Sequence, residues 1–210
     1  MCGVCRYNGS HRRERDLQAC EEMARCRRIF IAARRSAAME VRPPESDEEI
    51  RALIRAHGLS WREAYDDILP EAVRNEMTVD PTPEEVERWA AELDGDDTAV
   101  FVAVVDGAVR GFVDVRWGTE NTKPFVAPDE ADLKAIYVHP DWWGEGLGTA
   151  LLDRGLYALP DRIETVRLEA FADNDVGARF YEARGFNRVA TDNTEIDSET
   201  YPTTIYARDR

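Results

Sequence analysis

Hydrophobic and polar positions along the chain follow a helical period first and a strand period later. Three stretches open with a Ser or Thr followed three residues on by Glu, the capping box that begins helices. The helices predicted in this way cover Ile50–Ala56, Ala64–Met77 and Val86–Leu93. The next two runs are rich in β-branched residues and flank the turn residues Asp106-Gly107, so they predict a hairpin of strands. These strands are Thr98–Val105 and Ala108–Trp117.

From Ala131 the pattern changes to alternating strands and helices. Strands are predicted over Asp132–Val138, Ile163–Phe171, Phe186–Ala190 and Thr200–Ala207. Helices are predicted over Gly146–Leu159 and Asp175–Arg184, and Met39–Pro43 reads as a first strand. Early helices, a hairpin and then crossovers predict a single α+β or mixed α/β domain.

The charge of the chain narrows its partners. It has 42 acidic and 27 basic residues and a net charge of −15, which argues against a general nucleic-acid binder. The longest apolar runs, Ala99–Val105 and Ile29–Ala33, are far shorter than the roughly 20 residues of a membrane span. We therefore expect a cytoplasmic protein with no membrane partner. Its only lysines are Lys123 and Lys134, and an acidic, lysine-poor composition resembles proteins of salt-accumulating halophiles.

Residues 1–38 differ from the rest, with nine Arg and four acidic residues. They contain Cys2, Cys5, Cys20 and Cys26, with His11 between, but the spacing fits no common zinc finger, and we expect no metal. Residues 16–37 could instead form a basic helix that binds a partner. The interpretation we favour is an upstream extension, with the natural start at Met39 and one domain over residues 39–210.

The densest chemical signal is a strand that runs into a glycine-rich turn and a helix. The run is LKAIYVHPDWWGEGLGT, Leu133–Thr149. A turn of this kind aims backbone N–H groups and the positive end of a helix at one point, where a pyrophosphate fits. A tight structural turn is the alternative. The spacing matches neither the P-loop nor the dinucleotide-binding fingerprint.

These residues resemble the GNAT acetyltransferase superfamily. The family turn carries two glycines at the positions of Gly146 and Gly148. A second stretch, LEAFADN at Leu168–Asn174 followed by FYEARGF at Phe180–Phe186, is similar to the later strand–helix–strand block of the family, and in particular to the ribosomal-protein-alanine acetyltransferases. The resemblance covers residues 39–207. It implies an α+β acyl-CoA-binding fold with a central, mixed but mostly antiparallel sheet flanked by helices.

The resemblance also implies that acetyl-CoA is the co-substrate. Its implied ligands are the backbone of the strand, the amides of the turn and one Asn: Ile136, Tyr137, Val138, Gly144, Glu145, Gly146, Leu147, Gly148, Thr149 and Asn174. For Asn174 the alternative is a helix N-cap.

Three residues are candidates for the chemistry of acetyl transfer to an amine. The resemblance implies that Tyr181 is the acid beside the leaving thiol and that Glu169 is the base that takes the proton of the amine. Asp132 stands where other family members carry a strand carboxylate and is the second candidate for the base. The alternatives are a packed aromatic ring for Tyr181 and an outward carboxylate paired with Arg167 for Glu169. His57 is predicted at a helix end, where a cation suits the helix dipole.

Two residues depart from the family pattern. Trp143 stands where the family has Arg or Gln, and Glu145 brings a carboxylate to the expected phosphates, where it should weaken anion binding. They keep open a non-catalytic acyl-CoA-binding module as the alternative to an enzyme. The acceptor amine, a protein N-terminus or a small molecule, should be selected by residues 46–93 and 119–130. Dimers are common in the family, so a homodimer stays open.

Overall fold

The computed structural model describes residues 39–210, which form one compact unit. The four cysteines, His11 and the predicted basic helix lie outside these residues, and so do the zinc and partner hypotheses attached to them.

Seven strands form one mixed, mostly antiparallel sheet in the order β1-β2-β3-β4-β5-β7-β6. Their bounds are β1 Met39–Arg42, β2 Thr98–Val105, β3 Ala108–Trp117, β4 Glu130–Val138, β5 Thr165–Phe171, β6 Asn187–Ile196 and β7 Glu199–Asp209. The α+β fold class and the mixed sheet expected from the sequence are therefore confirmed, and the β2–β3 hairpin has the predicted bounds.

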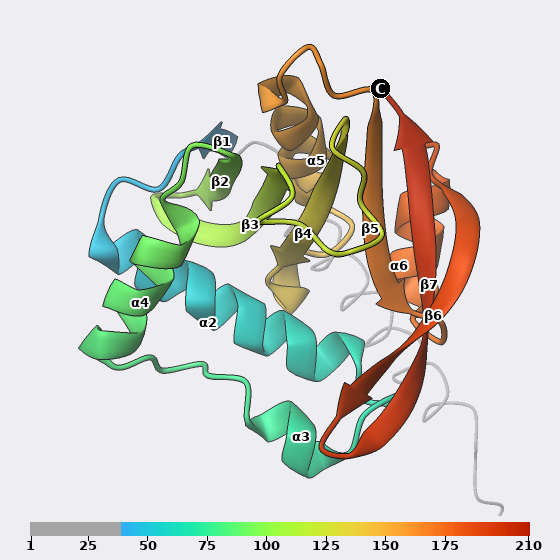
Figure 1. The fold of residues 1–210 in the computed structure, drawn as a ribbon. Coiled ribbons are helices and arrows are strands. Elements are labelled where there is room, and N and C mark those ends of the chain that lie inside the picture. The colour runs from blue at the N-terminus through green and yellow to red at the C-terminus, as the bar shows by residue number, and fades with distance from the viewer. Residues whose placement is uncertain (1–38) are drawn as a thin grey trace, which may run out of the picture. The chain divides into compact units, whose positions relative to one another are not determined.

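Helices cover both faces of this sheet (Figure 1). They are α2 Asp47–Ala64, α3 Glu71–Asn75, α4 Pro83–Leu93, α5 Leu147–Ala158 and α6 Asp175–Glu182, with a single 3₁₀ turn at Pro140–Trp142. Helices α2 and α4 pack on one face, where Leu53 and Val86 share a core with Phe112 of β3. Helix α5 packs on the other face, where Gly155 lies against Val113 and Val115.

The sheet splits between its two parallel strands. Strands β4 and β5 pair only over three residues, from Glu130 opposite Thr165 to Asp132 opposite Arg167. Beyond Asp132, β4 stays paired with β3, and β5 stays paired with β7. The β4–β3 register also shifts between Asp114 and Val115, which leaves Lys134 as an extra residue on β4. A cleft therefore opens between β4 and β5, and the backbone groups of β4 that point away from β3 face it.

The structure corrects the bounds of the helices predicted over Ile50–Ala56 and Ala64–Met77: α2 continues to Ala64, residues 65–70 are not helical, and only the short α3 follows. Helix α2 runs through Gly58 and through Ser60, the serine of the capping box predicted to begin the second helix, with Glu63 three residues on. Gly58 is there because the chain crosses α2 closely: a Cβ at Gly58 would lie 2.2 Å from the carbonyl oxygen of Thr78. Ser60 is buried and caps nothing. Tertiary packing thus overrides a local signal.

The C-terminal hairpin is longer than predicted. Strand β6 extends to Ile196 rather than Ala190, and the hairpin turn is made by Asp197 and Ser198, both at positive φ. The hairpin tip reaches the region of α3 (Figure 1). There Ile196 and Tyr201 pack on a small core of Tyr65, Leu69, Val73 and Phe171.

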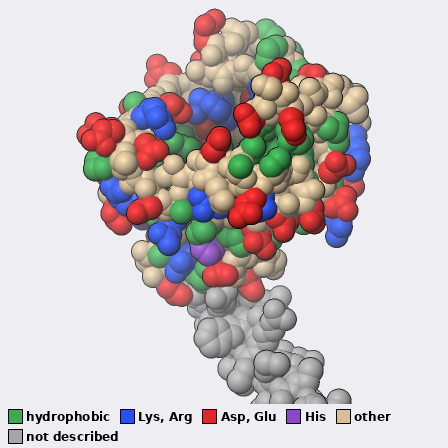
Figure 2. Space-filling model, turned by 90° about the horizontal axis from the view of Figure 1, so that it is seen from below, with side chains coloured by type: hydrophobic (Ala, Val, Ile, Leu, Met, Phe, Trp, Pro, Cys, Tyr) green, Lys and Arg blue, Asp and Glu red, His purple; other side chains and the backbone are tan. Residues whose placement is uncertain are grey.

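The surface of the described residues carries acidic side chains in many places rather than in one patch. Figure 2 shows Asp and Glu spread over the face seen from below, with Lys and Arg among them. Within residues 39–210, none of the helices is both long and apolar enough to cross a membrane.

Candidate active site

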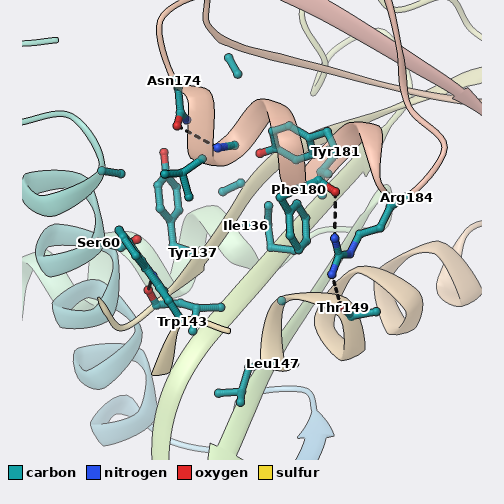
Figure 3. A pocket seen from close by; sticks show the side chains of 18 of the residues that line it. Ser60, Ile136, Tyr137, Trp143, Leu147, Thr149, Asn174, Phe180, Tyr181 and Arg184 are labelled. Atoms are coloured by element: carbon teal, nitrogen blue, oxygen red, sulfur yellow. Dashed lines mark hydrogen bonds between the residues drawn. The ribbon is translucent and has the colours of Figure 1, made fainter. Parts of the chain in front are cut away.

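A cavity of about 340 Å³ occupies the split between β4 and β5. Its walls come from α2, β4, the turn before α5, α5 itself, β5 and α6 (Figure 3). The predicted cofactor-binding residues that line it are Ile136, Tyr137, Val138, Gly144, Gly146, Leu147, Gly148, Thr149 and Asn174. Of the predicted catalytic residues, Glu169 and Tyr181 line it.

The glycine turn leaves an open cradle at the N-terminus of α5. Gly144 and Gly146 have φ of 80° and 88°, a left-handed conformation that glycine adopts without strain. A Cβ on either residue would have nothing within 4 Å, so the space in front of them is open. Gly146 caps α5 without a side-chain hydrogen bond, and the first N–H groups of a helix have no partner inside it. This end of the cavity can therefore bind an anion.

Glu145 is placed differently from its neighbours in the turn. It does not line the cavity. Its backbone N–H already donates to the carbonyl oxygen of Trp142, at 3.4 Å. Among the amides predicted to bind the cofactor, the N–H of Glu145 is therefore used in a hydrogen bond within the turn.

Trp143 uses its indole to close one side of the cavity. Its Nε1 donates a hydrogen bond of 2.6 Å to the carbonyl oxygen of Val138, the last residue of β4. This bond ties the turn to the strand end, in the place where the resemblance implies a basic or amide side chain. Trp143 thus contributes shape rather than charge to the anion end.

Asn174 combines both roles weighed for it in the sequence. Its Oδ1 accepts a hydrogen bond of 2.9 Å from the N–H of Gly177, which makes it the N-cap of α6. It also lines the cavity while being only 9% exposed. The cap fixes the side chain at the cavity wall.

Three tyrosines converge in the middle of the cavity. Tyr137 comes from β4 and Tyr181 from α6, on opposite sides (Figure 3), and Tyr65 comes from α2. Tyr65 and Tyr137 are close enough for each to influence the pKa of the other. Burial raises the pKa of Tyr181 and that of Tyr137 well above the ordinary value. Both phenols are therefore protonated at neutral pH and can act as hydrogen-bond donors.

Glu169 of β5 lines one end of the cavity and is paired there. Its carboxylate forms an ion pair with Lys123, from the loop between β3 and β4, and accepts a hydrogen bond of 2.5 Å from the hydroxyl of Thr203. Arg167, the partner considered from the sequence, pairs instead with Glu130 at 2.5 Å. A Glu169 that takes a proton from an amine must exchange Lys123 for that amine.

Asp132 lies near this end but does not line the cavity. Asp132 is 2% exposed. Burial raises the pKa of its carboxyl to about 6, and Lys123 opposes this shift. Asp132 and Glu169 lie on the same face of the sheet, because Asp132 is opposite Arg167, two residues before Glu169 on β5. Asp132 thus lies behind the cavity wall rather than in it.

His57 is not at a helix end, contrary to the sequence prediction. It lies in the interior of α2, because α2 continues past Gly58. Its ring contacts Tyr137 at 4.6 Å and Trp89 at 5.4 Å between centroids. Burial lowers its pKa to about 4, so His57 is neutral at pH 7 and packs as an aromatic ring.

Sequence reasoning missed several residues that line the cavity. Ser60 and Tyr65 line the cavity from α2, far from the motifs in sequence, and no local signal identifies them. Phe180 and Arg184 stand inside the second motif, and their position in that block is a signal that could have found them. Among residues 39–210, no group of three or more His, Cys, Asp or Glu side chains is placed to hold a metal ion.

A mixed sheet split between two parallel strands, with a glycine-opened helix N-terminus at the split, defines the acyl-CoA-binding class of α+β folds. The chain belongs to the acetyltransferase (GNAT) family, whose model matches residues 59–186, more than half of the chain. The resemblance drawn from the two motifs is thereby confirmed.

Curated relatives match parts of the chain. The [ribosomal protein bS18]-alanine N-acetyltransferase of Escherichia coli K12 is 40% identical over 80 residues, which are 38% of this chain and 51% of that protein. Mycothiol acetyltransferase of Rhodococcus jostii is 27% identical over 166 residues, 73% of this chain and 54% of that protein. The chain thus spans about half the length of these relatives.

Solved structures share the fold. The PaiA N-acetyltransferase of Thermoplasma acidophilum in complex with coenzyme A aligns with a TM-score of 0.58 at 22% identity, over 82% of this chain and 99% of that one. The ribosomal-protein-S18-alanine N-acetyltransferase of Escherichia coli aligns with a TM-score of 0.56 at 21% identity, over 82% and 94% of the two chains.

Proposed function

We propose that this protein transfers the acetyl group of acetyl-CoA to a primary amine. The observation that carries the proposal is the continuity of the cavity: one cavity joins the open glycine cradle of Gly144 and Gly146 to Tyr181 and to the carboxylate of Glu169. A backbone cradle can hold phosphates, a protonated phenol can act as an acid and a carboxylate can act as a base in acetyl transfer to an amine.

The residues of the cavity divide this work. The amides of the α5 N-terminus hold the phosphates, and the unpaired edge of β4 beyond Asp132 binds the pantetheine arm by backbone hydrogen bonds. A β4 N–H such as that of Ile136 polarises the acetyl carbonyl. The co-substrate supplies an acetyl thioester, in which the C–S bond breaks as the new C–N bond forms. Glu169 takes the proton of the amine, and Tyr181 donates to the leaving sulfur.

Tyr181 suits the role of donor because it is buried and protonated. Its pKa is raised by burial, so full transfer of its proton to a thiolate is unfavourable. A hydrogen bond to the sulfur still stabilises the developing negative charge. Tyr181 therefore acts as a fixed donor, and solvent restores any proton that it shares.

The acceptor is a peptide N-terminus or a small-molecule amine. Support for both comes from relatives, one named for ribosomal-protein alanine and one for mycothiol. The acceptor end is formed by Tyr65 of α2, Glu169 of β5 and Lys123 of the β3–β4 loop. A carboxylate beside aromatic rings favours an amine that arrives as an ammonium ion.

The proposal is tested by titrating acetyl-CoA into the full chain by calorimetry in concentrated KCl, and then following CoA release with a panel of amines and short peptides. Micromolar binding and amine-dependent release are expected. Binding without release by any amine would favour the non-catalytic acyl-CoA-binding module, for which Trp143 lining the cavity is the supporting feature. No binding by a folded sample would reject both functions.

A further inference from the structure

The anion end of the cavity lacks a basic side chain in its own turn. Trp143 contributes an indole there, and Glu145 carries a negative charge in the same turn. The whole chain has a net charge of −15. Backbone amides alone would have to bind phosphates against the repulsion from this negative charge. A cation from another part of the fold would offset that repulsion.

Arg184 reaches this place from the far wall. It follows the C-terminus of α6, and Figure 3 shows its guanidinium extended toward the first turn of α5. Its Nη2 donates to the hydroxyl oxygen of Thr149, and its Nη1 donates to the carbonyl oxygen of Phe180 at 2.9 Å. The guanidinium also stacks on the Phe180 ring, 3.8 Å from its centroid. Three contacts thus fix one cation at the N-terminus of α5.

This cation has donors to spare. A guanidinium has five N–H groups, and two of them make the bonds to Thr149 and Phe180. The Nε of Arg184 is buried and makes no hydrogen bond within residues 39–210. The Nε is closed off by the protein, so the donors left for a ligand oxygen are the second N–H of Nη1 and the second N–H of Nη2.

Arg184 also differs from its neighbours in sequence. Arg179 and Arg188 pair with Asp175 and Glu182, at 3.2 and 2.8 Å, and lie on the surface. Arg184 has no carboxylate partner among the described ion pairs, although the chain is rich in acidic residues. The described residues place only two basic side chains in the cavity wall, Arg184 and Lys134.

The bond to Thr149 has a further effect. Because the Thr149 oxygen accepts from Arg184, the hydroxyl proton is left free to be donated. Thr149 lies in the first turn of α5 beside the open cradle, so a phosphate there can meet the Thr149 hydroxyl, backbone amides and the guanidinium together. Charge-assisted hydrogen bonds of this kind are the strong ones.

We infer that Arg184 is a ligand of the pyrophosphate of acetyl-CoA and supplies the positive charge that the glycine turn lacks. The inference rests on the proposed function. The pyrophosphate is then held between α5 and α6, and its binding ties the two helices together across the cleft. Because Arg184 supplies the cation, position 143 does not need a basic side chain, and Trp143 lines the cavity there instead.

The experiment measures the dissociation constants of three ligands with the full chain: coenzyme A, 3′-dephospho-coenzyme A and acetyl-pantetheine, which has no pyrophosphate. Arg184→Gln is compared with wild type and with Arg179→Gln, which removes an exposed charge from the same segment. Arg184→Lys keeps the charge without the planar fork. Circular dichroism melting confirms that each variant is folded.

Arg184→Gln is expected to weaken coenzyme A and its dephospho form by about tenfold each, and to leave acetyl-pantetheine within about twofold. The salt dependence of coenzyme A binding becomes shallower in this variant, because one screened attraction is gone. Arg184→Lys is expected to lose less, and Arg179→Gln nothing.

Two results would overturn the inference while leaving the proposed function intact. One is unchanged affinity of Arg184→Gln for coenzyme A. The other is equal weakening of all three ligands, which would mean that Arg184 only joins α5 to α6. A wild-type protein that binds none of the three would overturn the proposed function and the inference together.

Discussion

The two ends of the cavity are built in different ways. The end proposed to bind the cofactor comes from two short stretches, residues 136–149 and 174–184, and its anion site is the backbone of the glycine turn. The acceptor end gathers Tyr65, Lys123, Glu169 and Thr203 from four distant segments, with Asp132 behind them. A site that uses backbone amides depends on local conformation, whereas a site that uses charged side chains depends on which segments meet. Substitutions at the acceptor end should therefore leave cofactor binding unchanged, and substitutions at the cofactor end should leave acceptor binding unchanged.

The largest effect on turnover is expected where the two ends meet, at Tyr181. Tyr181→Phe removes the donor to the leaving sulfur, and kcat should fall about a hundredfold, as for loss of a general acid. The affinity for acetyl-CoA should stay within about twofold, since the ring remains. Steady-state kinetics and calorimetry measure the two quantities.

Tyr206→Phe is the matched control for this prediction. Tyr206 is buried beside Tyr181, with 5.7 Å between the ring centroids, but does not line the cavity. The Tyr206→Phe variant should keep the kcat of the wild type. Equal losses of kcat and of cofactor affinity in Tyr181→Phe would show that Tyr181 is a packing residue.

A smaller effect is expected at the acceptor end, from Glu169→Gln. An α-amine with a pKa near 8 is about a tenth neutral at pH 7, so a base that only deprotonates the ammonium ion gains about tenfold there. The variant should lose about that factor at pH 7 and nearly nothing at pH 9, with cofactor affinity unchanged. A pH–rate profile of wild type and variant measures it.

The size of the activity loss in Glu169→Gln also distinguishes an α-amine acceptor from a lysine-like one. For a lysine-like amine, neutral less than one part in a thousand at pH 7, the loss could exceed a thousandfold. Glu164→Gln, an exposed carboxylate just before β5, is the control. A loss in Glu169→Gln that does not shrink as the pH rises would contradict the role of base.

An effect of the opposite sign is expected from Lys123→Met. The ammonium of Lys123 occupies the Glu169 carboxylate that the acceptor amine would use, and its side chain is 47% exposed. Half-exposed ion pairs are worth less than about 1 kcal/mol, so releasing Glu169 should raise kcat/KM for the amine about threefold. Acetyl-CoA affinity should not change.

Salt provides the internal check on this pair. Potassium chloride screens the Lys123–Glu169 attraction in wild type, so the advantage of Lys123→Met should shrink as salt rises. A variant that loses activity at every salt concentration would show that Lys123 helps to bind the acceptor.

The smallest effect on turnover, and the clearest one on stability, is expected from Asp132→Asn. The pKa of Asp132 is raised to about 6 in the folded protein, so folding favours its protonated form. The stability that this gives is complete below about pH 4 and is lost as the pH rises through 6. A shift of about two units corresponds to about 3 kcal/mol.

Denaturant unfolding across the pH range tests this expectation. Asp132→Asn should match wild type near pH 4 and exceed its free energy of unfolding by up to about 3 kcal/mol at pH 7, while Asp129→Asn, at an exposed position, changes little. Activity should stay within about twofold. A loss of activity in Asp132→Asn that Glu169→Gln lacks would make Asp132 the base.

The sequence alone determined the local elements that form the end proposed for the cofactor. The strand, the turn with Gly144, Gly146 and Gly148, and the helix after it follow from local periodicity and glycine chemistry, and the structure places them as expected. The β2–β3 hairpin also follows from its turn residues. The φ and ψ preferences of a few neighbouring residues determine these elements. They can therefore be predicted from the sequence pattern alone.

Only the tertiary structure decided the acceptor end. The continuous α2 puts Ser60 and Tyr65 in the cavity and His57 in its aromatic surroundings, because Gly58 lets the chain at Thr78 pass close by. The pairing of Glu169 with Lys123 depends on the position of the β3–β4 loop, and the raised pKa of Asp132 depends on its burial in the folded protein. The same holds for Arg184 against Thr149. The physical reason is that ion pairs and burial are set by distances in space between segments far apart in the chain, and these distances exist only once the chain has folded.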